Sequence, residues 1–286
     1  MTVPNTNTKV PTPSNPSSLK SRYSIRKLEP KHGPWAAAII IHSNLFHSPV
    51  WPVLYPKNIT ENVHKSLAAA SYLVDHQITS GMSFGVFDDE YVFKRPESEE
   101  VGGKLYWDDN EKSVEETQGL EAESLRLAEQ MDFPLVSVAL SYDSSDPLDF
   151  DKMGPLLACL PHFGLIYHIL AELDSRDPAS WQAKAHNEVL FRNATSTRRE
   201  YEGEKLMSGL ARWLMREADV RGWRGIQIEC VHDKVSYTWA NPEKPYKGTI
   251  VSKFDTKTWT NEEGKKAFEP ADQVITKVYV DLKPEA

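Results

Sequence analysis

Cysteine is scarce in this sequence, and the little that is present argues against a metal centre or a disulfide framework. Only Cys159 and Cys230 occur among the 286 residues. Each lies in an apolar run, a context that favours a buried free thiol over a metal ligand. We therefore expect no bound metal and a reducing compartment, with a single disulfide in a secreted protein as the alternative.

Long hydrophobic runs and an excess of positive charge are also missing. The longest apolar stretch, residues 35–41, is far shorter than the roughly 20 residues of a membrane span. The N-terminus lacks the basic-then-apolar pattern of a signal peptide. A net charge of −8 gives no general attraction to phosphate backbones. We expect a cytoplasmic protein, with nuclear access open, that binds neither a membrane nor a nucleic acid.

The composition that remains is that of a globular protein with a sizeable core. Apolar residues make up 40% of the chain and charged residues 26%, and the tryptophans number 8. Residues 1–21 differ, because they are mainly Pro, Ser, Thr and Asn, a composition that cannot offset the entropy of ordering. We predict a disordered tail over residues 1–21 and a single domain over residues 22–286.

Hydrophobic periodicity predicts strands and helices throughout this domain. Apolar residues at spacings of three and four predict helices, and β-branched or alternating apolar runs predict strands. The expected helices are 35–46, 59–78, 151–173 and 206–221, and the prolines of the third allow two short helices instead. The expected strands are one that starts at residue 23 and those at 82–87, 135–140, 189–195, 225–231 and 273–282. Residues 104–107 are the possible pairing partner of strand 82–87, and strand 273–282 is expected to close the sheet. The pattern indicates a mixed α/β fold.

A strongly acidic segment interrupts this pattern at residues 108–123. It contains few large apolar side chains, which is typical of a solvated surface insertion. The alternative is a docking site for a basic partner, and the protein would then be an interaction module.

The strand 189–195, the turn after it and the helix 206–221 are the segment most informative about function. A helix N-terminus at such a turn presents unpaired backbone N–H groups and the positive end of the helix dipole, which together favour anions. Arg198, Arg199 and Lys205 gather there in an otherwise acidic chain and could neutralise phosphate charge. With the strand that follows the helix, the segment predicts two neighbouring parallel strands joined by a right-handed crossover.

The turn reads YEGEKLM and resembles the loop of the GNAT N-acetyltransferase superfamily, which reads approximately Y-R-G-x-G-I-G. Tyr201 and Gly203 match this pattern. Glu202 replaces the usual Arg or Gln, Lys205 the middle Gly, and Met207 the final Gly or Ala. Other segments are similar to a fungal group of GNAT-like proteins, and this resemblance covers most of the chain. The segments are YLVDHQITSGMSFGVFDDEYVFKRPES, QMDFPLVSVALSYD, NATSTRREYEG and RGIQIEC.

This resemblance implies a strongly twisted mixed sheet flanked by helices, with coenzyme A held in a cleft between two splayed strands. Acetyl-CoA or another acyl-CoA would be the co-substrate, without a metal. Glycines in such a loop let the backbone approach the pyrophosphate, so Lys205 would either obstruct that approach or supply charge. The residues expected on the cofactor side are Asn193, Ala194, Thr195, Thr197, Arg198, Arg199, Tyr201, Gly203, Glu204, Lys205, Leu206 and Met207.

The resemblance also directs attention to the end of the strand 225–231, where a base would take a proton from an attacking amine. Glu229 lies on the strand face opposite its apolar residues, His232 lies at the end of the strand, and Tyr237 follows five residues later. His232 is the first candidate for the base because imidazole titrates nearest neutral pH, and Glu229 is the second. Each residue has a structural alternative: a partner carboxylate for Glu229, a cap for His232, and an amphipathic wall residue for Tyr237.

These patterns predict a coenzyme A-dependent N-acyltransferase that acts on a small-molecule or protein amine. A non-catalytic acyl-CoA-binding relative is the first alternative, because the glycine motif is degenerate. The interaction module based on the acidic segment is the second.

Overall fold

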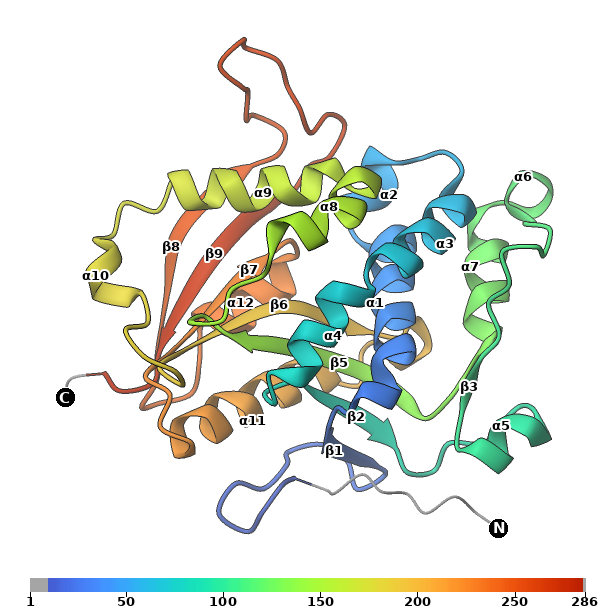
Figure 1. The fold of residues 1–286 in the computed structure, drawn as a ribbon, viewed down its shortest axis with the longest axis horizontal. Helices are drawn as coiled ribbons and strands as arrows, with labels where there is room; N and C mark the ends of the chain where they lie inside the picture. Colours follow the sequence, from blue (N-terminus) through green and yellow to red (C-terminus); the bar gives the residue numbers. More distant parts are fainter. Residues whose placement is uncertain (1–9, 285–286) are drawn as a thin grey trace.

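Seven strands form one mixed sheet in the order β1-β2-β5-β6-β7-β9-β8 (Figure 1). The structure is a computed structural model that describes residues 10–284. A separate pair, β3 and β4, lies beside the main sheet. The strands are β1 (Tyr23–Lys27), β2 (Phe84–Asp88), β3 (Lys104–Leu105), β4 (Met131–Asp132), β5 (Leu135–Asp143), β6 (Val189–Thr197), β7 (Gly225–Cys230), β8 (Lys247–Asp255) and β9 (Val274–Asp281).

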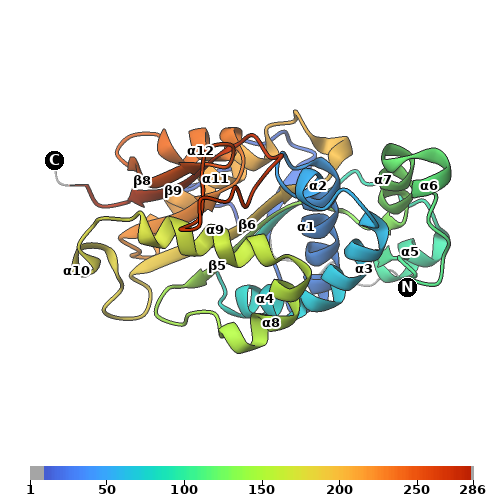
Figure 2. The ribbon, with the colours of Figure 1, turned by 90° about the horizontal axis from the view of Figure 1, so that it is seen from above.

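Helices cover both faces of the main sheet (Figures 1 and 2). The helices α11 and α12 pack on one face, and α1, α4 and α9 pack on the other. The helices are α1 (Gly33–His47), α2 (Trp51–Leu54), α3 (Ile59–Ala69), α4 (Ser71–Thr79), α5 (Pro96–Val101), α6 (Glu115–Gln118), α7 (Leu120–Glu129), α8 (Phe150–Cys159), α9 (Pro161–Glu172), α10 (Pro178–Trp181), α11 (Leu206–Val220) and α12 (Asp233–Ala240). None of the helices within residues 10–284 has both the length and the apolar character that a membrane crossing requires.

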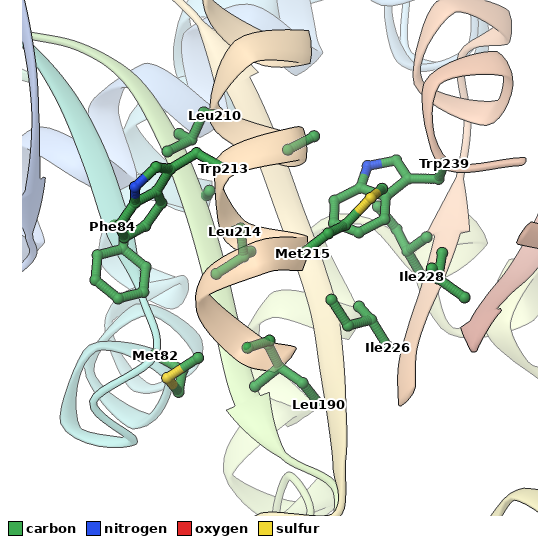
Figure 3. Close-up of a cluster of buried hydrophobic side chains, with 14 of the residues drawn as sticks. Met82, Phe84, Leu190, Leu210, Trp213, Leu214, Met215, Ile226, Ile228 and Trp239 are labelled. Atoms are coloured by element: carbon green, nitrogen blue, oxygen red, sulfur yellow. The ribbon is translucent and has the colours of Figure 1, made fainter. Parts of the chain in front are cut away.

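The helix α11 shows why the predicted periodicity forms this architecture. Its apolar residues recur every three or four positions and meet β2, β6 and β7 in one core cluster (Figure 3). Trp213 is fully buried and contacts Phe84 edge to face, with ring centroids 4.9 Å apart. Loss of such an aromatic side chain costs about 3–5 kcal/mol of stability. The predicted apolar residues of the helix are all buried: Leu206, Leu210, Trp213, Leu214 and Ala218.

The predicted parallel pair is confirmed, because β6 and β7 run parallel and α11 connects them. Their pairing runs from Val189 opposite Gly225 to Arg192 opposite Ile228. Both strands continue beyond that point without pairing with each other, since β6 extends to Thr197 beside β5 and β7 extends to Cys230 beside β9. The two strands therefore splay apart at their carboxyl ends.

Two predicted strand relationships are wrong. The strand β2 pairs with β1 and β5, whereas residues 104–105 pair with β4. The strand β9 does not close the sheet, because β8 pairs with its other edge. Sequence periodicity missed β8 because an edge strand with Lys247, Gly248, Thr249 and Lys253 faces water and carries few apolar residues.

Two of the predicted helical regions are each divided into two helices in the structure. The helix expected over 59–78 is divided at Ala70 into α3 and α4. The region 151–173 forms two helices, the alternative that its prolines allowed, and the break falls at Leu160 before Pro161. Pro155 instead lies inside α8.

The predicted disordered tail falls partly on residues 1–9, which lie outside the described residues. Residues 10–21 differ from that expectation, because the structure packs them against α11. Asn15 is buried and accepts a hydrogen bond from the Trp213 indole through its carbonyl, at 3.2 Å. Its side chain also bonds Glu217 and Arg216. Specific hydrogen bonds to a packed helix thus order a segment whose composition is polar.

The acidic segment 108–123 is partly structural. Glu115 accepts hydrogen bonds from the backbone amides of Ile59 and Thr60, at the start of α3. Glu123 is fully buried, and its carboxylate binds Arg126 and Thr60. At least these two carboxylates stabilise the fold and do not form a solvated face.

Candidate active site

A β-bulge in β6 changes the direction of the strand beside the splay. Leu140 of β5 pairs with Ala194, and the next residue, Ser141, pairs with Arg192. Asn193 therefore has no opposite residue. An extra residue of this kind bends the strand and redirects its side chains and backbone groups.

The splay opens into a cavity of about 960 Å³. Residues 193–197 of β6 and residues 228–230 of β7 form its walls at the sheet. The start of α11 and the start of α12 line one part, and α1, α4, α8 and α9 line the other. A cavity of this size is at the upper end of the range for small-molecule and cofactor sites.

The start of α11 presents free backbone donors to this cavity. The first amide of the helix with an intrahelical acceptor is that of Gly209, which bonds the Lys205 carbonyl at 2.9 Å. The amides of Leu206, Met207 and Ser208 precede it, and these three residues line the cavity. The first turn of the helix carries no acidic residue. The helix terminus is thus suited to an anion such as a diphosphate.

The turn before α11 has the backbone conformation that glycine favours at two positions. Gly203 has φ +84° and Lys205 has φ +62°. A non-glycine residue in this left-handed region costs roughly 1–2 kcal/mol. Lys205 stands where the resembled loop has its middle glycine, so this chain keeps the backbone shape and adds a positively charged side chain at the cavity.

Most residues predicted for the cofactor side line the cavity, but Arg198 and Glu204 do not. Arg198 is buried, and its guanidinium donates to the Phe133 carbonyl and to Glu200. Glu204 forms an ion pair with Lys20. The predicted role of Arg198 in neutralising phosphate does not fit this position, because its charge is already paired inside the fold. The predicted residues that line the cavity are Asn193, Ala194, Thr195, Thr197, Arg199, Tyr201, Gly203, Lys205, Leu206 and Met207.

Glu229 lies at the splayed end of β7 and lines the cavity. Burial raises the pKa of its carboxyl to about 7, against a usual value of 4.5. The Glu229 side chain is half-buried. The Gln227 side-chain amide donates to Glu229 Oε1 at 3.4 Å. A carboxyl with this pKa can both take and release a proton near neutral pH.

His232 and Tyr237 line the same cavity but stand in different surroundings. His232 caps α12, and its Nδ1 accepts a hydrogen bond from the Lys234 backbone amide at 3.1 Å. That bond occupies the lone pair of Nδ1 and assigns the proton of the neutral ring to Nε2. Tyr237 is 71% exposed, which places it at the mouth of the cavity.

No protein-family model and no curated protein match this chain. Among solved structures, the C-terminal condensation domain of Ebony in complex with beta-alanyl-dopamine is similar over 91% of this chain and 98% of its own, at 14% identity and a TM-score of 0.59. Arylalkylamine N-acetyltransferase 2 from Aedes aegypti is similar over 92% of this chain and 100% of its own, at 10% identity and a TM-score of 0.55. The chain has the GNAT acetyltransferase fold. The predicted fold class is thereby confirmed, and the likeness to a fungal group stays a prediction.

Within this GNAT fold, α9 supplies a residue at the site that the sequence reasoning missed. Tyr167 lines the cavity, and its hydroxyl accepts a hydrogen bond from the Asn193 side-chain amide at 2.7 Å. Burial raises the pKa of Tyr167 well above its usual value, and the nearby carboxylate of Glu229 raises it further. The sequence signal was a single tyrosine in a mostly apolar helical run. That signal could not show which part of the sheet the helix covers.

Proposed function

We propose that this protein is an N-acyltransferase that moves an acyl group from an acyl-CoA to an amine, with Glu229 as the base. One observation carries the proposal: a carboxyl with a pKa of about 7 lines the same cavity as the anion-binding start of α11. Binding of a phosphorylated donor and removal of an amine proton are the two tasks of this reaction. Groups suited to both tasks line the cavity at the splay between the parallel strands β6 and β7, which supports the proposal.

The residues at the turn fit the diphosphate of coenzyme A. The amides of Leu206, Met207 and Ser208 would donate to it, and Lys205 would add charge at the rim. Arg199 also lines the cavity, where it is bonded to Glu202 at 2.6 Å. The splayed end of β6 would leave unpaired backbone groups for the pantetheine arm. When bound, acyl-CoA supplies the activated acyl group as a thioester.

Glu229 has the protonation behaviour that the acceptor requires. Near its pKa of about 7 a large fraction of the carboxyl is ionised and able to accept a proton. The amine nitrogen forms the new amide bond, the bond from the acyl carbon to sulfur breaks, and Glu229 takes the proton that the nitrogen loses. Coenzyme A would leave as the thiolate and take up a proton to become the free thiol. The geometry favours Glu229 over His232, because the Nδ1 lone pair of His232 is used by the α12 cap.

A non-catalytic acyl-CoA-binding protein is the second candidate function. Its support is the replacement of two loop glycines by Lys205 and Met207. The use of acyl-CoA as the acyl donor also needs a direct test, because one of the similar solved structures is a condensation domain. The interaction module loses part of its support, since the half-buried Glu115 is hydrogen-bonded to the start of α3 and Glu123 is buried.

Thermal unfolding with acetyl-CoA, followed by an assay for release of free thiol, tests the proposal. We expect acetyl-CoA to raise Tm, because a ligand of the folded state stabilises it by mass action. We then expect thiol release that depends on an added primary amine. A rise in Tm without amine-dependent release would instead support the binding protein, and no rise would overturn both.

Two variants test the base. Glu229→Gln should lower kcat by roughly 100-fold or more with little change in acetyl-CoA affinity, because proton transfer is lost and binding is not. His232→Asn is the matched control, since asparagine also caps a helix but cannot act as a base. It should keep kcat within about threefold. A large loss in His232→Asn with normal turnover in Glu229→Gln would assign the base to His232.

A further inference from the structure

The charged residues that line the cavity all come from the turn before α11, from α11, from β7 and from the start of α12: Arg199, Glu202, Lys205, Arg212, Glu229, Asp233 and Lys234. The rest of the helical lining, which we call the acceptor chamber, consists of residues within 40–51, 70–74 and 156–167. Among the described residues that line the acceptor chamber there is no Asp, Glu, Lys or Arg.

Aromatic side chains form a wall of the acceptor chamber that leads to Glu229. The ring centroids of Trp51 and Phe163 lie 6.5 Å apart, and those of Phe163 and Tyr167 lie 4.9 Å apart. Tyr167 is the end of this wall nearest the base, because the carboxylate of Glu229 raises its pKa. An acceptor with its nitrogen at Glu229 would therefore lie with its organic part along these rings.

The one histidine that lines the acceptor chamber adds no charge near neutral pH. Burial lowers the pKa of His47 below its usual value. Its Nε2 is hydrogen-bonded to the Ser124 hydroxyl at 2.8 Å. The charge of Glu202 also acts on His47, but the Glu202 carboxylate is bonded to Arg199 at 2.6 Å. The chamber lining thus supplies no carboxylate that could replace the water around a second cationic group of an acceptor.

From this chemistry we propose that the acceptor is a monoamine whose remaining part is apolar, an aryl- or alkylamine, and that diamines and polyamines are poor acceptors. The inference rests on the proposed function. An apolar group gains free energy on leaving water for this chamber, whereas a second ammonium would lose its hydration without a partner. Glu229 is the carboxylate whose charge acts on Tyr167, and the reacting nitrogen requires it.

Hexylamine and 1,5-diaminopentane form a matched pair of probes, because a methyl group in one replaces an ammonium in the other. We expect kcat/KM for hexylamine to exceed that for the diamine by about 10-fold or more. Phenethylamine should also be accepted. Equal values, or a preference for the diamine, would overturn the inference.

Phe163→Glu tests whether the missing carboxylate sets this preference. It should raise the ratio of diamine to hexylamine kcat/KM by about 10-fold relative to Phe163→Gln, which has the same size and no charge. A ratio that is the same in both variants would count against the inference. The Tm of each variant shows whether it is folded before the ratio is taken.

A binding measurement separates failure of this inference from failure of the proposed function. With coenzyme A present, hexylamine should raise Tm more than 1,5-diaminopentane does at the same concentration. If neither amine supports thiol release but this order of Tm holds, the chamber is assigned correctly and the catalytic proposal fails. If neither amine changes Tm and neither is acylated, the inference fails as well.

Discussion

Lys277 and Glu229 are opposite each other across β9 and β7, yet the Lys277 ammonium binds Asp174, with Nζ 3.1 Å from Oδ2. Burial alone would raise the pKa of Asp174, but hydrogen bonds from Arg176 and Lys277 lower it to about 2. Asp174 is thus ionised throughout the neutral range. Burial raises the pKa of Glu229 to about 7, the charge of Lys277 opposes that rise, and the negative charge of Asp174 adds to it.

If Glu229 is the base of the proposed reaction, Asp174→Asn should move the acid limb of the kcat/KM profile to lower pH by roughly one unit. The variant frees Lys277 to approach Glu229, and an ammonium beside a carboxylate favours its ionised form. The other groups that face Glu229 are Tyr167 of α9, Tyr142 of β5 and Cys230 of β7. Their pKa values are raised by burial, so they stay neutral over this pH range. The measurement is kcat/KM from pH 5 to pH 9.

Lys277→Met is the opposing variant. It removes the positive charge that lowers the pKa of Glu229, so the same limb should move to higher pH. Shifts of the two variants in the same direction would show that they act through the packing of the fold and not through the charge at Glu229.

Glu229→Gln should make the protein more stable at pH 8. The carboxyl has a pKa of about 7 when folded and an ordinary value of 4.5, so the unfolded chain releases its proton first as pH rises. The free energy of unfolding of the wild type therefore falls as pH rises from about 4.5 to 7. The glutamine variant does not lose this stability, because its side chain does not ionise. The gain should be near zero at pH 4 and up to about 3 kcal/mol at pH 8, as measured by urea unfolding. A gain that is the same at both pH values would contradict the raised pKa.

Lys205→Gly should raise the free energy of unfolding by up to about 1 kcal/mol, because glycine adopts φ +62° without the cost of a Cβ. The same variant should weaken acetyl-CoA binding up to about fivefold at low salt, since an exposed charge near the diphosphate is lost. The difference should shrink as salt rises.

Lys205→Asn is the matched control, because asparagine tolerates the left-handed conformation and is uncharged. Equal weakening in the glycine and asparagine variants would assign the effect to charge. Tighter binding of acetyl-CoA by the glycine variant than by wild type would show that the lysine side chain obstructs the turn.

The sequence by itself determined the central strand-helix-strand unit. The spacing from Leu206 to Ala218 identifies the buried face of α11, and the alternation along β7 and β9 separates their two faces. The parallel pairing of β6 and β7 followed from the length of the connection between them. These features depend on local periodicity and chain connectivity, which a single sequence contains.

Only the tertiary structure decided which polar side chains share the site. Arg198 directly follows the end of β6 and its position in the sequence predicts a phosphate ligand, yet the fold buries it against Phe133. His232 becomes a helix cap, and Tyr167 reaches Asn193 from a helix 26 residues earlier in the chain. The pKa of Glu229 depends on burial by α9 and on Lys277 held by Asp174, which are far from it in sequence. Burial and long-range contacts are properties of the packed chain, so no local pattern of residues could have specified them.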